Sequence, residues 1–286
     1  MRVAILGAGG MLGHDLVATA PAEVTVVPFT HADLDITDAA AVERMLTEQR
    51  PEVLINAAAY TQVDKAEDEV ELAHRVNAWA LGMLGQAAAR VGVRVVHFST
   101  DYVFDGTAQT PYTEDSPTNP INQYGLSKLR GEEALRASGA EALIIRTQWL
   151  FGIHGRSFPR TMWERATAGQ KTRVVNDQTG RPTYTPDLAV ATWNLLSLRP
   201  AGCRKPNIVH VANEGVTTWY DLARVVYGAA GVRDLVSPIA TADYPTPARR
   251  PAHSALDTGR FETQTGRCLP SWEHAIGRFL AQIGAT

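Results

Sequence analysis

The chain contains 286 residues, and 45% of them are hydrophobic, which is enough to bury a large core and argues against a mainly disordered protein. The 27 basic and 30 acidic residues are interspersed and give a net charge of −3, so no nucleic-acid partner is expected. The two cysteines, Cys203 and Cys268, lie far apart, which disfavours a disulfide framework or a zinc site and fits a reducing compartment.

In the first half of the chain, short apolar runs alternate with helix-length amphipathic segments. A parallel sheet covered by helices on both faces requires this alternation, because its strands are buried on both sides. The pattern predicts an α/β fold with a Rossmann-like, doubly wound parallel sheet over residues 1–150. Its strands are expected at residues 3–6, 24–27, 53–55, 93–98 and 143–145.

After about residue 146 the alternation loosens, and residues 151–286 are expected to form mainly a smaller C-terminal α/β lobe, with later segments returning to the first domain. The first strand begins too early for a signal peptide, and no apolar run approaches the ~18 residues of a membrane span. A cytoplasmic protein is therefore expected.

In the part of the chain after residue 150, helices are predicted near 160–168, from Pro186, at 218–227 and after Ser271, and a strand is predicted at 208–211.

A glycine-rich loop, Gly-Ala-Gly-Gly-Met-Leu-Gly at residues 7–13, follows the first strand and precedes a helical stretch. This is the context of a dinucleotide-binding fingerprint. Gly7 permits a tight turn, Gly10 lets the backbone approach a pyrophosphate, and Gly13 allows close helix–strand packing, while the helix N-terminus attracts the anion. The loop predicts nucleotide binding, although a glycine turn without a ligand is the alternative.

The sequence gives no preference between NADH and NADPH. Residues 28–31 contain neither an acid nor an arginine where a ribose-binding group is expected. Asp35 is expected to line the adenine pocket, whereas Asp38 fits a turn or a helix cap better. Small residues at 56–59 allow a coenzyme to pack against the backbone, although an alanine run also suits helix packing.

Tyr124 and Lys128 are four residues apart, which places them on one face of a helix. Carbonyl reduction needs a proton donor, and a nearby ammonium lowers the pKa of a phenol from its usual value of about 10. Ser99 and Thr100 end the fourth strand, where open α/β sheets bind ligands. Together these features predict catalysis by Tyr124, whereas a Tyr/Lys pair by itself is common on surface helices.

These residues resemble those of the dTDP-4-dehydrorhamnose reductases, sugar-nucleotide members of the extended short-chain dehydrogenase/reductase family. The similarity spans nearly the whole chain, and Ser-Thr-Asp-Tyr-Val-Phe at 99–104 is its most specific part. Its other markers lie at 7–13, 56–61, 63–67, 76–78, Tyr124 with Lys128, 146–149, 177–178, 180–183, 213–215, 219–220, 249–251 and Ser254.

The resemblance implies reduction of dTDP-4-dehydro-6-deoxy-L-mannose to dTDP-L-rhamnose by NADPH or NADH. The implied catalytic residues are Thr100, Tyr124 and Lys128. Contacts with the dTDP-sugar are expected from Thr100, Asp101, Val103, Tyr124, Trp149 and Arg250. Coenzyme contacts are expected from Gly7, Gly10, Met11, Leu12, Gly13, Asp35, Ile36, Ala58, Ala59, Tyr60, Thr61, Ser99, Tyr124 and Lys128.

Several alternatives stay open. Gln148 stands where many relatives have a serine, and Arg249 and Arg250 fit either a pyrophosphate clamp or a solvated basic pair. Some relatives bind Mg²⁺ at a dimer contact, so Mg²⁺ and a homodimer are considered, although no carboxylate cluster identifies a metal site. The alternative functions are a ketoreductase for another dTDP-deoxysugar, an epimerase or dehydratase, and a non-catalytic regulatory subunit on the same fold.

Overall fold

The computed structural model describes residues 1–198 and 207–284, and its centre is a six-stranded sheet in which all neighbouring strands are parallel. The strand order reverses between β1 and β3, which creates the crevice where doubly wound sheets bind ligands. The predicted fold class is confirmed. In spatial order the strands are β10 (Asn207–His210), β5 (Ala142–Thr147), β4 (Arg94–Thr100), β3 (Val53–Asn56), β1 (Arg2–Leu6) and β2 (Thr25–Phe29).

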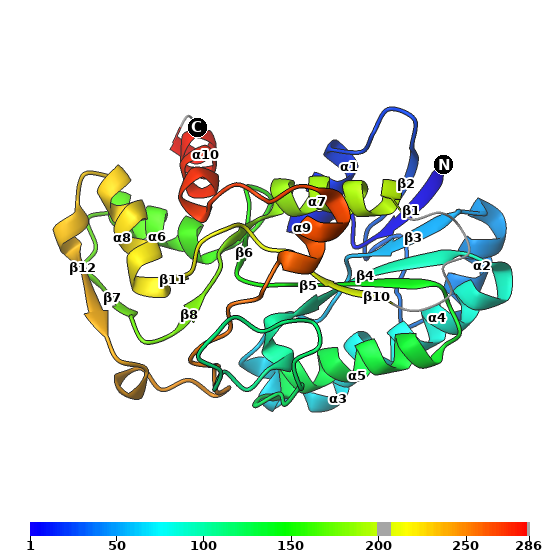
Figure 1. Cartoon of the computed structure of the whole chain (residues 1–286), viewed down its shortest axis with the longest axis horizontal. Coiled ribbons are helices and arrows are strands. Elements are labelled where there is room, and N and C mark those ends of the chain that lie inside the picture. The colour runs from blue at the N-terminus through cyan, green and yellow to red at the C-terminus, as the bar shows by residue number, and fades with distance from the viewer. Residues whose placement is uncertain (199–206, 285–286) are drawn as a thin grey trace.

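Helices cover both faces of this sheet (Figure 1), as the strands' apolar runs require. Successive strand residues point to opposite faces, so Val96 packs in one core cluster and Val95 in the other. One face is covered by α1 (Met11–Ala18), α7 (Thr185–Leu198) and α9 (Gly259–Thr265), and the other by α2 (Ala39–Gln49), α4 (Ala80–Val91) and α5 (Gln123–Ala137).

Short helical segments connect the strands near the crevice. Between β3 and α4 the chain forms η1 (Lys65–Glu67), α3 (Val70–His74) and η2 (Arg75–Trp79), the last of which is a π-helical turn. A 3₁₀ turn, η3 (Asp101–Val103), follows β4 directly. π-Helical turns are often found at functional sites.

Much of the chain after residue 150 forms a smaller lobe with its own core, which includes Phe151, Leu222 and Trp272 (Figure 1). The helices expected near 160–168, at 218–227 and after Ser271 are α6, α8 and α10. The elements of this lobe are β6 (Leu150–Phe151), α6 (Phe158–Thr167), β7 (Thr172–Val175), β8 (Thr179–Gly180), β9 (Thr183–Tyr184), β11 (Thr217–Thr218), α8 (Trp219–Ala229), η4 (Arg233–Leu235), β12 (Val236–Ile239), η5 (Thr241–Asp243) and α10 (Trp272–Gly284).

Three segments that follow residue 150 in the sequence belong to the main sheet or to the helices that cover it. β10 pairs with β5 through residues such as Ile208 and Ile144, and α7 and α9 pack on the sheet. Among the described helices none is long and apolar enough to span a membrane. Cys268 is free and exposed, whereas Cys203 lies outside the described residues.

Candidate active site

The glycine loop makes a tight turn between β1 and α1. Gly7 has a φ of 75°, and the Gly10 N–H donates to its carbonyl oxygen at 2.9 Å. A Cβ on Gly13 would lie 2.7 Å from the Ala8 Cα and would overlap the Gly7 carbonyl, so α1 packs directly against the loop. No side chain caps the start of α1. This first turn therefore has the N–H groups and positive dipole end that a pyrophosphate requires.

The predicted adenine-side residues follow β2. Asp35 is exposed, and one of its oxygens accepts hydrogen bonds from the N–H and hydroxyl of Thr37, both at 2.8 Å, which lower the pKa of the carboxyl. Ile36 is buried in the core. Asp38 caps α2 by accepting from the Ala41 N–H at 3.0 Å, as predicted. Contacts of Asp35 and Ile36 with a coenzyme stay predictions.

Sequence reasoning missed an acid at the tip of β2. The strand ends at Phe29, and the Asp33 carboxylate accepts from the N–H of Thr30 at 2.8 Å and from its hydroxyl at 2.6 Å. These hydrogen bonds lower the pKa of Asp33. The Thr-x-x-Asp spacing was the available signal.

Asn77 of the π-helical turn fixes the stretch after β3. Its Oδ1 accepts from the Tyr60 N–H at 2.9 Å, and its Nδ2 donates to the Tyr60 carbonyl at 3.0 Å and to the Ser127 hydroxyl at 2.9 Å. Asn77 thus joins the predicted coenzyme-binding stretch, in which Ala58 to Tyr60 are half-buried and Thr61 is exposed, to α5 beside Lys128. The sequence marked this asparagine only as part of a motif without a role.

The carboxyl ends of β4 and β5 carry buried polar groups without partners. The Ser99 hydroxyl, the Thr147 hydroxyl and the Gln148 Nε2 accept or donate no hydrogen bond within the described part of the chain. A buried polar group left unpaired costs about 1–3 kcal/mol, so native proteins rarely keep several together without a ligand or water. This edge of the sheet is suited to binding a polar ligand.

The structure brings Thr100 and Tyr124 together at this edge. Asn122 caps α5 by accepting from the Gly125 N–H at 2.7 Å, which places Tyr124 in the first turn. The phenol forms a hydrogen bond with Thr100, whose hydroxyl also donates to Asp101 at 3.0 Å. A phenol, an alcohol and a carboxyl group are therefore linked in one row.

Burial controls the protonation of Tyr124. Burial and the negative charge of Asp101 raise the pKa of the phenol to about 12, although the hydrogen bond with Thr100 opposes them. Lys128 is not among the groups that shift this pKa, and the expectation that its charge makes the phenol more acidic stays a prediction. The Lys128 ammonium donates to the Phe98 carbonyl at 2.6 Å instead, and burial lowers its own pKa to about 8. At neutral pH Tyr124 is a protonated donor beside a charged lysine.

Asp101 and Val103 lie on the same turn but differ in surroundings. Asp101 is 2% exposed, and burial raises its pKa to about 7 against the hydrogen bonds from Ser254 and Thr100. Val103 has no exposed surface and packs with Phe104 in a small core cluster. The side chain of Val103 is thus a packing group, and a substrate contact by this residue stays a prediction.

Trp149 has a backbone conformation that is rare outside glycine, with a φ of 47°. Its ring stacks on Trp219 with centroids 3.6 Å apart and an interplanar angle of 11°. Gln148 beside it accepts from the Arg181 N–H at 3.0 Å. Strained residues cluster at functional sites, which agrees with the predicted ligand contact of Trp149.

Arg250 forms a two-pronged ion pair with Asp64. Its Nη2 donates to the Asp64 Oδ2 at 2.7 Å, and its Nη1 contacts the other carboxylate oxygen. The pair lowers the pKa of Asp64. Arg249 is exposed and contributes its carbonyl to Asn122 at 2.8 Å. Arg250 is therefore not a free cation, and its predicted contact with the substrate stays a prediction.

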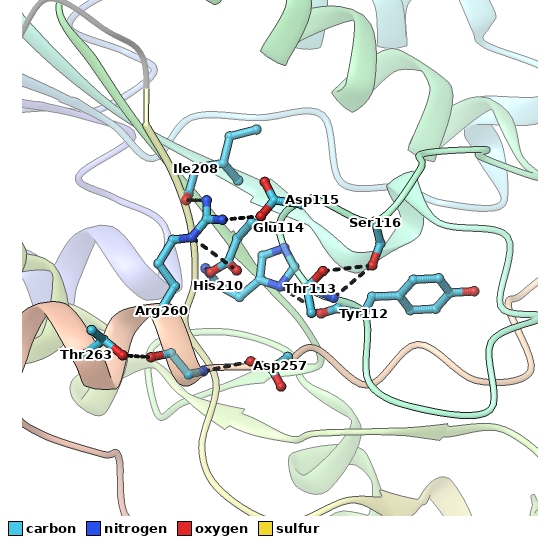
Figure 2. A network of polar contacts seen from close by, with 11 residues as sticks. Tyr112, Thr113, Glu114, Asp115, Ser116, Ile208, His210, Asp257, Arg260 and Thr263 are labelled. Carbon is cyan, nitrogen blue, oxygen red and sulfur yellow. Dashed lines mark hydrogen bonds and ion pairs between the residues drawn. The ribbon is translucent and has the colours of Figure 1, made fainter.

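A second polar network, which sequence reasoning missed, holds the segment after η3 (Figure 2). The His210 N–H of β10 donates to Glu114 at 2.8 Å, and its ring Nδ1 lies 3.1 Å from the Tyr112 carbonyl. Arg260 of α9 donates to Asp115 at 2.6 Å. Burial lowers the pKa of His210 to about 3, so the ring stays neutral. The network joins the segment after η3 to β10 at the edge of the sheet and to α9.

Residues 1–284 match the family model described as the RmlD substrate binding domain. The chain belongs to this family. It is 39% identical to the dTDP-4-dehydrorhamnose reductase of Burkholderia thailandensis over 289 residues, which cover 97% of each chain. The expected family is thus confirmed.

Solved structures of the family agree. A dTDP-4-dehydrorhamnose reductase from Clostridium acetobutylicum superposes with a TM-score of 0.93 at 36% identity, covering 99% of this chain and 100% of its own. The enzyme from Bacillus anthracis, solved in complex with NADP, has a TM-score of 0.93 at 35% identity and covers 98% and 99%. Across residues 1–198 and 207–284 there is no group of three or more His, Cys, Asp or Glu side chains that could hold a metal ion.

Proposed function

We propose that this protein reduces dTDP-4-dehydro-6-deoxy-L-mannose to dTDP-L-rhamnose with a nicotinamide coenzyme. The observation that carries the proposal is the Thr100–Tyr124 hydrogen bond at the carboxyl end of β4, across the crevice from the glycine loop, with Lys128 buried on the same helix. The names of relatives that match nearly the full length support the substrate.

The residues of the crevice fit a dinucleotide. The uncapped start of α1, the close turn at Gly7 and the unpaired Ser99 hydroxyl offer contacts for pyrophosphate and for the polar groups of a nicotinamide nucleoside. The NADP in the Bacillus anthracis relative supports NADPH as the coenzyme here. When bound, the reduced nicotinamide supplies the hydride.

The protein's own residues handle the proton. As the carbonyl oxygen of the sugar gains negative charge, Tyr124 donates its phenolic proton to it. The phenolic O–H bond breaks and a new O–H bond forms on the sugar. Thr100 orients the phenol and the substrate oxygen. The Lys128 ammonium stabilises the phenolate left on Tyr124, since an opposite charge favours the ionised form.

Further substrate contacts are assigned to Trp149 and to a segment that follows the first domain. We assign the face of Trp149 to the sugar or base, and the Arg250 segment to the nucleotide end of the dTDP-sugar.

The cytoplasmic location and the homodimer also stay predictions, and sedimentation of the purified protein tests the homodimer.

Coupled assays test the function. The purified protein is supplied with the product of a dTDP-glucose dehydratase and a 3,5-epimerase, and consumption of NADPH or NADH is followed optically. We expect turnover that Tyr124→Phe abolishes while leaving coenzyme binding intact. Tyr244→Phe, at a side chain that is 56% exposed, serves as the matched control.

The outcomes separate the alternatives. Turnover only with other dTDP-ketosugars would identify a different ketoreductase, and coenzyme binding without any turnover would identify a non-catalytic subunit. Wild-type rates for Tyr124→Phe would contradict the assignment of Tyr124 as the proton donor.

A further inference from the structure

His97 is a buried histidine beside the catalytic lysine, and the proposed mechanism gives it no role. It lies on β4 directly opposite Asn56 of β3, and it faces the side of the sheet that α5 covers. Its ring Nδ1 is 3.2 Å from the Asn56 Nδ2, and its Nε2 is 3.1 Å from the Lys128 Nζ. His97 and Asn56 are each 1% exposed and Lys128 is 2% exposed. The three side chains therefore contact one another directly.

The orientation of the Asn56 amide determines which nitrogen of His97 carries the hydrogen. The Asn56 Oδ1 accepts from the Ala58 N–H at 3.1 Å, which leaves the Nδ2 to face the ring as a donor. The ring Nδ1 then has to accept. Burial holds the pKa of His97 well below its ordinary value, against a contact with the Asn56 backbone that favours the protonated ring, so the ring is neutral and has one N–H. That hydrogen is on Nε2.

This tautomer conflicts with a charged lysine. An ammonium has donors only, and an Nε2–H is also a donor. The arrangement is satisfied when Lys128 is neutral and accepts from Nε2–H. When Lys128 is charged, Nε2 has to accept, the hydrogen has to move to Nδ1, and Asn56 has to turn an oxygen toward the ring.

We propose that His97 is a positioning residue that couples the charge of Lys128 to the orientation of the Asn56 amide, and through it to the Ala58 N–H in the coenzyme-binding stretch. On charging, Nζ takes the Nε2 proton and Nδ1 gains one proton from solvent, so the pair gains a single proton. The Asn56 Oδ1 then accepts from Nδ1–H and releases the Ala58 N–H for a ligand. The inference rests on the proposed function for the role of Lys128.

Other charged groups near the pair are held by partners of their own. Glu132, on the next turn of α5, favours the charged form of Lys128, but both of its oxygens are paired with Arg146 of β5 at 2.6 and 2.9 Å. Tyr124 on α5 and Asp101 on η3 form the row with Thr100. On the β3 side the ring meets the uncharged Asn56. Lys128 is thus the charged group in direct contact with His97.

Nitrogen-15 NMR of the histidine rings tests the coupling without any turnover. His97→Gln identifies the His97 resonances by their loss. We expect an Nε2–H ring above about pH 8, where Lys128 is neutral, and an Nδ1–H ring below it. Asn56→Leu is expected to leave the tautomer unresponsive to pH. A single tautomer throughout the titration, or a doubly protonated ring, would overturn the proposal.

The pH dependence of kcat/KM gives a second readout. His97→Gln offers the ammonium a permanent acceptor, so the alkaline limb of the profile is expected to move up by about one pH unit, a tenfold change in the charged fraction. His97→Phe keeps the ring but removes the acceptor, and its limb is expected to move down by a similar amount. Unchanged limbs in both folded variants contradict the coupling. A protein that responds by NMR but lacks turnover contradicts only the proposed function.

Discussion

The Asp64 carboxylate and the Arg250 guanidinium, 186 residues apart in the chain, form a two-pronged ion pair that joins the segment after β3 to the segment before α9. Both segments contain predicted ligand-binding residues. The Ala248 N–H also donates to Asp64 at 3.1 Å, so one carboxylate orders both the side chain and the backbone of the later segment.

Arg250→Ala is expected to lower kcat/KM by about tenfold or more, since hydrogen bonds to charged groups contribute about 1.5–3 kcal/mol. The reason is loss of the tie to Asp64 together with any direct contact to the dTDP-sugar. Steady-state kinetics with the ketosugar check the expectation. Arg249→Ala is the matched control and should stay near wild type, because that neighbour contributes only its carbonyl to Asn122. Equal losses in both variants would contradict the assignment.

Gly13→Ala is expected to abolish measurable coenzyme binding and to destabilise the fold. Its new Cβ would overlap the Gly7 carbonyl, and a backbone atom cannot move aside as a flexible side chain can. Fluorescence titration with NADPH and thermal unfolding measure the two effects. Gly9→Ala is the control, because its Cβ would meet only the Thr30 side chain, at 3.5 Å. Tight binding by the Gly13 variant would disprove the role of the loop.

Arg146→Ala is expected to lower the free energy of unfolding by about 3–5 kcal/mol, because it leaves Glu132 buried without its partner. The two side chains are 3% and 2% exposed. Arg130 and Glu133 lie on α5, the helix that also carries Glu132. Their side chains are 60% and 47% exposed, so Arg130→Ala should cost less than about 1 kcal/mol. Urea denaturation compares the two variants, and similar costs would show that burial does not control the strength of the pair.

Asp101 is expected to make stability depend on pH. Its pKa is about 7 in the folded protein and 3.8 ordinarily, so the folded state holds a proton that the unfolded state has lost between these values. The stabilisation is present below pH 3.8 and is lost as the pH rises to about 7. Relative to Asp101→Asn, wild type should lose more than about 1 kcal/mol of unfolding free energy over this range, as urea denaturation at several pH values will show. If the unfolding free energies of wild type and variant change in parallel with pH, the carboxyl of Asp101 is exposed to solvent in the folded protein, which would contradict the prediction.

Local patterns predicted much of the fold and part of the site. The first five strands follow from apolar runs, and the positions of Gly7 and Gly13 follow from spacing, because both depend on neighbours within one supersecondary unit. The place of Thr100 in the site followed from the rule that open α/β sheets bind ligands at the carboxyl ends of their strands.

Features that depend on burial or on distant partners were not predictable. Asn56 and His97 are 41 residues apart, and no sequence signal distinguishes this histidine from an ordinary core residue. The pKa of Tyr124 was expected to fall through the charge of Lys128. In the folded protein it rises, because desolvation and the negative charge of Asp101 outweigh the hydrogen bond with Thr100, while the Lys128 ammonium is directed at the Phe98 carbonyl.

The position of β10 at the edge of the main sheet affects how the gene can be divided. A truncation after residue 150 would remove β10 and the α7 cover, and would leave the backbone of β5 as an open edge able to recruit strands from other molecules. The nucleotide-binding half is therefore expected to aggregate when expressed by itself. Recombination between relatives should succeed only when the sheet and its returning segments are exchanged as one unit.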